Sequence, residues 1–266
     1  HEYAAKMPII DYHCHLPPEE IADDKTWSTI TEVWLDGDHY KWRAMRSNGV
    51  DENYVTGDAS HWDRFSNWAE TMPKLIGNPL YHWNQLELAR YFNVFDLLGP
   101  SSAEKIYSQC NELLGEEGLS SRKLIKQSNV KVICTTDDPC DTLEHHEKIN
   151  TDSTIECKVI PAWRPDKAMM PEKGKDFISW VESLSEASGV KINGFDDFTD
   201  ALQKRHQFFH EKGCRLSDHG IETFYAENYK EKEIHSIFQK AISGTDLDEK
   251  EILKFKSHML YIFGVM

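Results

Sequence analysis

Two histidines separated by one residue are the sharpest chemical signal in the sequence. His13 and His15 follow the apolar pair Ile9-Ile10 in a short run that ends at Pro17. Side chains at positions i and i+2 of a β-strand point to one face, and two imidazoles there can bind one zinc ion at about 2.0–2.1 Å each. The alternative is a pair of hydrogen-bonded core histidines. We expect this strand to be buried, and burying two imidazoles that bind no ligand would cost free energy. We therefore predict that His13 and His15 bind a divalent metal, with zinc as the expected ion.

These two histidines do not complete a catalytic zinc site, which usually has three protein ligands besides water or substrate. No other segment has clear metal-ligand spacing, and His145-His146 lie beside Glu144 and Glu147, where we expect a solvated helix face. The chain has no initiator Met, and its last segment is an apolar helical pattern with nothing after it. We expect a fragment of a longer chain, with further ligands beyond Met266.

Ionisable residues also follow three other strand-like runs, at 130–136, 158–163 and 213–217. The residues that follow them are Asp137 and Asp138, Arg164 and Asp166, and Asp218 and His219. In a parallel α/β barrel such strand ends meet at the face that carries the active site. Loops favour Asp for structural reasons too, and we expect Asp137 and Asp138 to shape a loop and cap a helix.

Arg164 is the predicted anchor for an anionic substrate. The formal net charge is −15, so a negatively charged ligand needs a local cation, and a guanidinium matches a carboxylate bidentately. The alternative for Arg164 is a salt bridge to Asp166 or another acid of the loop. Asp218 could orient a sugar hydroxyl or a catalytic histidine, and His219 could do either or cap the next helix.

The elements that must position these residues alternate between strand and helix. Apolar residues repeat at helical spacing over 177–184, ending near Gly189, and over 198–209, with Asp196 as the expected cap. Ser101 with Glu104 and Asp246 with Glu249 resemble capping boxes.

This alternation predicts an α/β fold with parallel strands. Residues 17–129 are far longer than one crossover and indicate a mainly helical insertion after the first strand. Four strands are half of a (β/α)₈ barrel, which typically takes ~250 residues or more. A flavodoxin-like sheet is the competing architecture, but its phosphate-binding glycine loop is missing. We therefore expect residues 1–266 to be part of one metal-dependent barrel domain whose later strands are absent.

The composition bounds the class of protein. Hydrophobic residues make up 39% of the 266 residues, enough for a core, and no apolar run is long enough to span a membrane. The acidic balance argues against nucleic-acid binding. The six cysteines are scattered, with no CxxC pair and no secretion signal, which indicates free thiols and a cytoplasmic location. A homo-oligomer is left open.

Longer strings of the sequence resemble uronate isomerases, members of the amidohydrolase superfamily. The segment Pro-Ile-Ile-Asp-Tyr-His-Cys-His-Leu-Pro-Pro at 8–18 is similar to the family's first strand. Further similar strings, in order along nearly the whole chain, are 34–43, 77–83, 134–139, 161–167 and 214–220.

The resemblance implies interconversion of D-glucuronate with D-fructuronate and of D-galacturonate with D-tagaturonate. It implies the N-terminal half of a distorted (β/α)₈ barrel with zinc or a similar divalent ion. The family's other metal ligand, an Asp at the eighth strand, and a His after the fifth strand belong to its second half, and the sequence stops before both.

The resemblance also places His39 and Tyr40 at the active site. A histidine suits proton transfer, and a tyrosine can donate to a developing oxyanion; by spacing alone they would be an aromatic pair on an amphipathic helix. Two other functions stay open. One is a zinc-dependent hydrolase of the same superfamily, and the other is an inactive fragment that lacks the remaining metal ligands.

Overall fold

The computed structural model describes residues 3–116 and 118–266. The chain forms two compact units: a sheet unit, made of the chain up to Ala22 together with Val130–Met266, and a helical unit, Asp23–Asn129. The helical unit accounts for most of the 17–129 segment, while the helix α1 (Pro18–Ala22) belongs to the sheet unit and packs against α8 (Glu144–Thr151). In the described ranges, no helix is long and apolar enough to cross a membrane.

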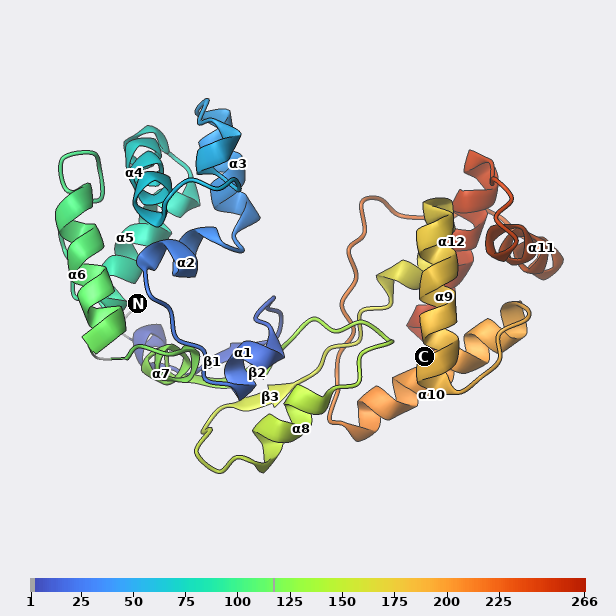
Figure 1. Ribbon diagram of the computed structural model, residues 1–266. Helices are drawn as coiled ribbons and strands as arrows, with labels where there is room; N and C mark the ends of the chain where they lie inside the picture. The colour runs from blue at the N-terminus through green and yellow to red at the C-terminus, as the bar shows by residue number, and fades with distance from the viewer. Residues whose placement is uncertain (1–2, 117) are drawn as a thin grey trace. The chain divides into compact units, whose positions relative to one another are not determined.

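The sheet is parallel, with the order β1-β2-β3 (Figure 1). Its strands are β1 (Ile9–Asp11), β2 (Val130–Cys134) and β3 (Lys158–Ile160). Beyond β3, Trp163 forms isolated parallel bridges with Asp137 and with Ser217. These bridges continue the parallel pairing beyond the carboxyl ends of β2 and β3.

The run at 213–217, predicted to be a fourth strand, forms no strand in the described part of the chain. It is joined to the end of β3 by two backbone hydrogen bonds, Trp163 N to Leu216 O at 3.1 Å and Asp218 N to Trp163 O at 3.0 Å. The parallel direction that the sequence predicted is present, but the pairing is too short to count as a strand.

The expectation that β1 is buried was wrong. The side chains of Ile9 and Ile10 are 47% and 65% exposed. Within the described residues β1 pairs with β2 along one edge, so its apolar side chains have few partners. The histidines that follow β1 are therefore near solvent.

Four longer helices of the sheet unit lie together (Figure 1). They pack around a cluster of phenylalanines that includes Phe177, Phe198, Phe238 and Phe255. They are α9 (Lys175–Ser188), α10 (Phe195–Glu211), α11 (Glu231–Ile242) and α12 (Glu249–Val265). Short 3-10 helices cover Ala4–Lys6, Asp166–Met169 and Pro171–Lys173.

Helix boundaries agree with the sequence to within a few residues. Gly189 ends α9 in the left-handed conformation, with φ 66°, as predicted. The N-cap of α10 is Gly194 rather than Asp196. The capping box of α12 is Asp248 with Glu251, two residues later than Asp246 with Glu249, because the Asp248 carboxylate accepts a hydrogen bond from Glu251 N.

The helical unit has a core of its own, which includes Ile30, Phe65, Trp68 and Leu88. Its helices are α2 (Ile30–Leu35), α3 (His39–Ser47), α4 (His61–Thr71), α5 (Pro79–Tyr91), α6 (Ala103–Glu116) and α7 (Ser121–Gln127), with 3-10 helices at Glu52–Tyr54 and Met72–Lys74. Helix α6 begins after Ser102, and the hydroxyl of Ser102 donates to Leu97 O and accepts from Gly99 N.

Candidate active site at the strand ends

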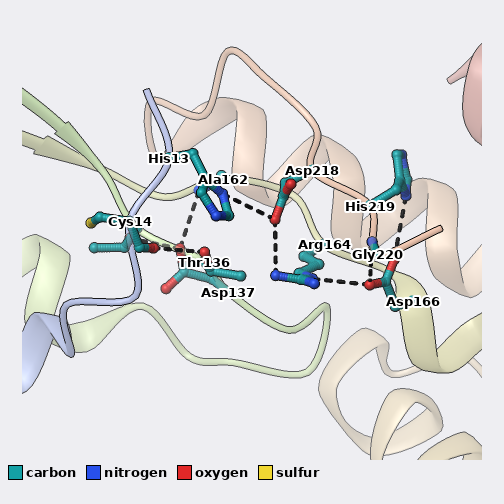
Figure 2. A network of polar contacts seen from close by, with 11 residues as sticks. His13, Cys14, Thr136, Asp137, Ala162, Arg164, Asp166, Asp218, His219 and Gly220 are labelled. Carbon is teal, nitrogen blue, oxygen red and sulfur yellow. Dashed lines mark hydrogen bonds and ion pairs between the residues drawn. The ribbon is translucent and has the colours of Figure 1, made fainter. Parts of the chain in front are cut away.

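A continuous line of ionisable side chains crosses the carboxyl ends of the strands. In Figure 2 it runs from His13 through Asp218 and Arg164 to Asp166. His13 Nδ1 is 3.4 Å from Asp218 Oδ2, and Arg164 Nη1 is 3.0 Å from the same oxygen. Arg164 Nε donates to Asp166 Oδ2 at 2.9 Å. The structure thus brings together residues that the sequence placed at the ends of three different runs.

The backbone after β1 is fixed by the end of β2. Cys14 N donates to Cys134 O at 3.1 Å, and the Thr136 hydroxyl donates to Cys14 O at 2.7 Å (Figure 2). These bonds hold the residue between the two histidines against the sheet. His13 and His15 both keep exposed side chains.

The rings of His13 and His15 lie side by side, with centroids 5.0 Å apart and planes at 88°. Two imidazoles on one tetrahedral zinc ion would have centroids about 5 Å apart, because each ring centre lies about 3 Å from the metal. The pair could therefore hold part of the coordination shell of a divalent ion. Among the described residues, no group of three His, Cys, Asp or Glu side chains could hold a metal on its own.

Arg164 is already engaged by acids, as the salt-bridge alternative anticipated. It contacts both Asp166 and Asp218, at 2.9 Å and 3.0 Å. The Asp218 contact is close enough for an ion pair but lacks hydrogen-bond alignment, so the buried Asp218 Oδ2 has no aligned donor in the described part of the chain. An acceptor in that state can still take a hydrogen bond from a ligand.

Asp166 connects the line to the loop after Ser217. Its Oδ2 accepts from Gly220 N at 2.8 Å, and its Oδ1 is 3.5 Å from His219 Nδ1. Burial raises the pKa of Asp166, but the nearby His219 ring and the hydrogen bonds from Gly220 and Arg164 outweigh burial and hold the pKa below its usual value. His219 stacks on Phe263 of α12, with centroids 5.3 Å apart and planes at 11°.

The sequence interpretation gave Asp166 no role of its own. It appeared among the ionisable residues at the strand ends and as a potential salt-bridge partner of Arg164. The signal that could have found it is the spacing Arg164-Pro-Asp166 after a strand, which returns the carboxylate toward the arginine.

A buried polar group joins β2, β3 and α8 next to this line. Asp137 Oδ2 accepts from the Thr135 hydroxyl at 2.7 Å and from Ala162 N at 3.1 Å, and the Thr135 hydroxyl contacts His146 Nε2 at 2.8 Å. Burial raises the pKa of Asp137 to about 6 and lowers the pKa of His146 to about 4. Arg164 N donates to Asp137 O at 3.1 Å, so this group also fixes the backbone under Arg164.

The expectation that His145-His146 form a solvated face was wrong for one of them. His146 is 1% exposed, because its side of α8 faces the strand ends and Thr135 binds its ring. Asp138 shapes the loop, as predicted: it accepts hydrogen bonds from Cys140 N and from Trp180 Nε1.

The other predicted pair lies in the helical unit. His39 and Tyr40 form the first turn of α3, where the Asp38 carboxylate accepts from Tyr40 N and Lys41 N. Both side chains are exposed, and their ring centroids are 4.3 Å apart. Tyr40 borders an open pocket of about 530 Å³ that Arg43 and Trp83 also line.

A family model described as glucuronate isomerase matches residues 1–266. The chain belongs to the glucuronate isomerase family. Uronate isomerases of Bacteroides thetaiotaomicron and Phocaeicola vulgatus are 56% and 55% identical to it over its whole length. The chain spans 57% of the length of each of these curated relatives.

Solved structures of the glucuronate isomerase family agree with the fold. The uronate isomerase of Thermotoga maritima matches 98% of this chain with a TM-score of 0.91 and 36% identity, and the match covers 57% of that structure. The glucuronate isomerase of Caulobacter crescentus matches 97% of the chain with a TM-score of 0.89 and 24% identity, over 55% of that structure, and shows the fold alone.

Proposed function

We propose that the native protein carrying this chain is a uronate isomerase. It interconverts D-glucuronate with D-fructuronate and D-galacturonate with D-tagaturonate. The match of the glucuronate isomerase family to residues 1–266 carries this proposal. The cluster of imidazoles, carboxylates and one guanidinium at the strand ends supports it, because this set suits an anionic polyhydroxylated substrate.

The architecture that we propose is the N-terminal half of a distorted (β/α)₈ barrel of the amidohydrolase superfamily, with 17–129 as a mainly helical insertion. The parallel order β1-β2-β3 and the parallel bridge from Trp163 to Ser217 support successive barrel strands. The exposure of Ile9 and Ile10 supports it too, because a closed barrel would bury them against further strands.

His13 and His15 are the proposed protein ligands of a divalent ion, with zinc expected. When bound, the ion supplies Lewis-acid stabilisation to the sugar oxygens at C1 and C2. The balance of charge near His13 supports a cation there: Asp166 and Asp218 bring two carboxylates against the single guanidinium of Arg164. Without an added positive charge, this site would repel a uronate.

Arg164 is the proposed anchor for the uronate carboxylate, and Asp218 accepts a hydrogen bond from a sugar hydroxyl or orients a histidine. His219 contacts the substrate from the same loop. His39 moves a proton, and Tyr40 donates a hydrogen bond to the oxygen on which charge develops. Free thiols at all six cysteines favour a reducing, cytoplasmic location.

The proposal is tested by offering D-glucuronate to the native protein with zinc and following ketose formation. We expect turnover that a chelator removes and zinc restores. Amide or ester hydrolysis with no ketose would support the metal-dependent hydrolase instead. If neither activity were detected, the chain would be interpreted as an inactive piece of a metal-binding barrel.

A further inference from the structure

We propose that Asp166 is the positioning residue for the substrate anchor: its carboxylate clamps Arg164 and the 218–220 segment into one arrangement. This inference rests on the proposed function, because it assigns how that site holds its carboxylate-binding arginine. Asp166 acts through Arg164 and through the loop, without touching the substrate.

The first observation is the bond that Asp166 makes to the guanidinium. Asp166 Oδ2 accepts from Arg164 Nε at 2.9 Å. Nε is the donor nearest the aliphatic stem, so this bond fixes the plane and direction of the whole guanidinium. The terminal nitrogens lie outside this bond, and Nη1 is 3.0 Å from Asp218 Oδ2 without the alignment of a hydrogen bond.

The second observation is that the same oxygen holds the loop. Gly220 N donates to Asp166 Oδ2 at 2.8 Å, and His219 Nδ1 lies 3.5 Å from Asp166 Oδ1 (Figure 2). One carboxylate therefore ties the arginine from the end of β3 to the segment that carries Asp218 and His219. Losing the carboxylate would free both at once.

The third observation is the space at Gly220. A Cβ at this position would lie 2.9 Å from Arg164 Nη2 and 3.1 Å from Asp166 Oδ2. The backbone of Gly220 thus lies close to the guanidinium, and a larger residue at this position would have to displace the end of the Arg164 side chain. The arginine is bound on its Nε side by Asp166, and the Gly220 backbone lies close to its Nη2, which together narrow its choice of rotamer.

The fourth observation is the charge of Asp166. Its side chain is only 13% exposed, yet hydrogen bonds from Arg164 and Gly220, together with the nearby His219 ring, hold its pKa below the usual value, so it is ionised at neutral pH. A buried carboxylate with this set of partners is costly to leave unpaired. Arg164 is accordingly bound to a permanent partner and keeps its place when the substrate leaves.

A double-mutant cycle on the native protein tests this clamp. We expect Asp166→Ala to raise the KM for D-glucuronate about tenfold or more, with a smaller fall in kcat, and Asp166→Asn, which keeps an acceptor without the charge, to lie between. In an Arg164→Met background, Asp166→Ala should raise KM by a clearly smaller factor than in the native protein, because the anchor that it positions is gone and only its hold on residues 218–220 remains to be lost. Glu147→Gln, which removes the exposed ion pair to Lys212, is the matched control and should change neither constant.

If Asp166→Ala raised KM by the same factor in the native protein and in Arg164→Met, the clamp would be overturned. A residue that matters only for folding would have an effect independent of Arg164. A crystal structure of Asp166→Ala provides a readout that does not need turnover. The proposal requires the Arg164 guanidinium and residues 218–220 to move, and an unmoved arginine would reject it. If Asp166→Ala does not fold, Asp166→Asn takes its place in both measurements. If the native protein shows no uronate turnover, the proposed function fails, and the crystal structure still decides on the clamp.

Discussion

The positive charge of Arg164 pairs with two carboxylates, those of Asp166 and Asp218. This pairing determines how the loss of Arg164 changes the charge of the site. Because Asp166 and Asp218 keep their negative charges when the guanidinium is lost, Arg164→Met should make the site one unit more negative and weaken its attraction for uronates. We expect the KM for D-glucuronate to rise by about 10- to 100-fold, which corresponds to a charge-assisted hydrogen-bonded pair.

The measurement that separates this role from general damage compares a uronate with a neutral sugar. Turnover or binding of the neutral sugar should fall much less in Arg164→Met. Lys167→Met is the control, because it removes a nearby cation that pairs with Asp138. Equal losses for charged and neutral sugars would remove the carboxylate role from Arg164.

The two histidines after β1 make the second prediction at this scale. His13→Ala should abolish zinc binding and isomerisation in the native protein, because one imidazole and a neighbouring acid seldom hold zinc alone. Metal content measured by mass spectrometry after dialysis checks it. His145→Ala, on the surface of α8, should leave the zinc content unchanged. Stoichiometric zinc in His13→Ala would mean that the ion sits elsewhere.

At the scale of elements, the buried group Thr135-Asp137-His146 ties a helix to two strand ends and gives stability an unusual dependence on pH. The pKa of His146 falls from 6.5 to about 4, so His146 makes stability rise as the pH increases from about 4 to 6.5. The pKa of Asp137 rises from 3.8 to about 6, so Asp137 makes stability fall as the pH increases from about 4 to 6. The two effects cover nearly the same range and oppose each other.

Single substitutions should therefore expose a slope that the native pair conceals. Each shift exceeds two pKa units, which corresponds to a contribution to the free energy of unfolding on the order of 3 kcal/mol. Between pH 4 and 6.5, we expect the free energy of unfolding, taken relative to that of the native protein, to rise with pH in Asp137→Asn and to fall with pH in His146→Gln. Urea unfolding followed by tryptophan fluorescence measures this. Parallel pH profiles for the three proteins would contradict the assigned pKa shifts.

Which elements the sequence could predict depends on how local their causes are. Helices α9 and α10 follow from apolar spacing and from Gly189, because these signals lie within the helix itself. The exposure of β1 and the burial of His146 could not be predicted in that way, because both depend on what packs against the element from elsewhere in the chain.

The same distinction holds for the site. His13, Arg164 and Asp218 were found because each follows an apolar run and carries a group with evident chemistry. The role of Asp166 was missed because it depends on three partners, and only Arg164 is near it in sequence. The fold brings Gly220 and His219 to it from more than 50 residues away.

At the scale of the whole molecule, the residues that the structure describes form two cores that share no residue. One cluster of buried side chains lies within the helical unit, from Ile30 to Leu119, and the other lies within the sheet unit, from Leu143 to Phe263. The helical unit is also continuous in sequence, Asp23–Asn129. A continuous segment with its own core has what a domain needs in order to fold alone.

We therefore expect a fragment of residues 23–129 to be helical and to unfold cooperatively. Circular dichroism with urea or heat gives the measurement, and Phe65→Ala, at a fully buried position, provides the sensitivity check, with an expected loss of about 3–5 kcal/mol. A gradual, non-cooperative loss of signal would mean that the buried side chains from Ile30 to Leu119 are insufficient by themselves. Cooperative unfolding that Phe65→Ala weakens would show that an insertion after the first strand can carry its own stability, leaving the strand-end residues free to be selected for chemistry.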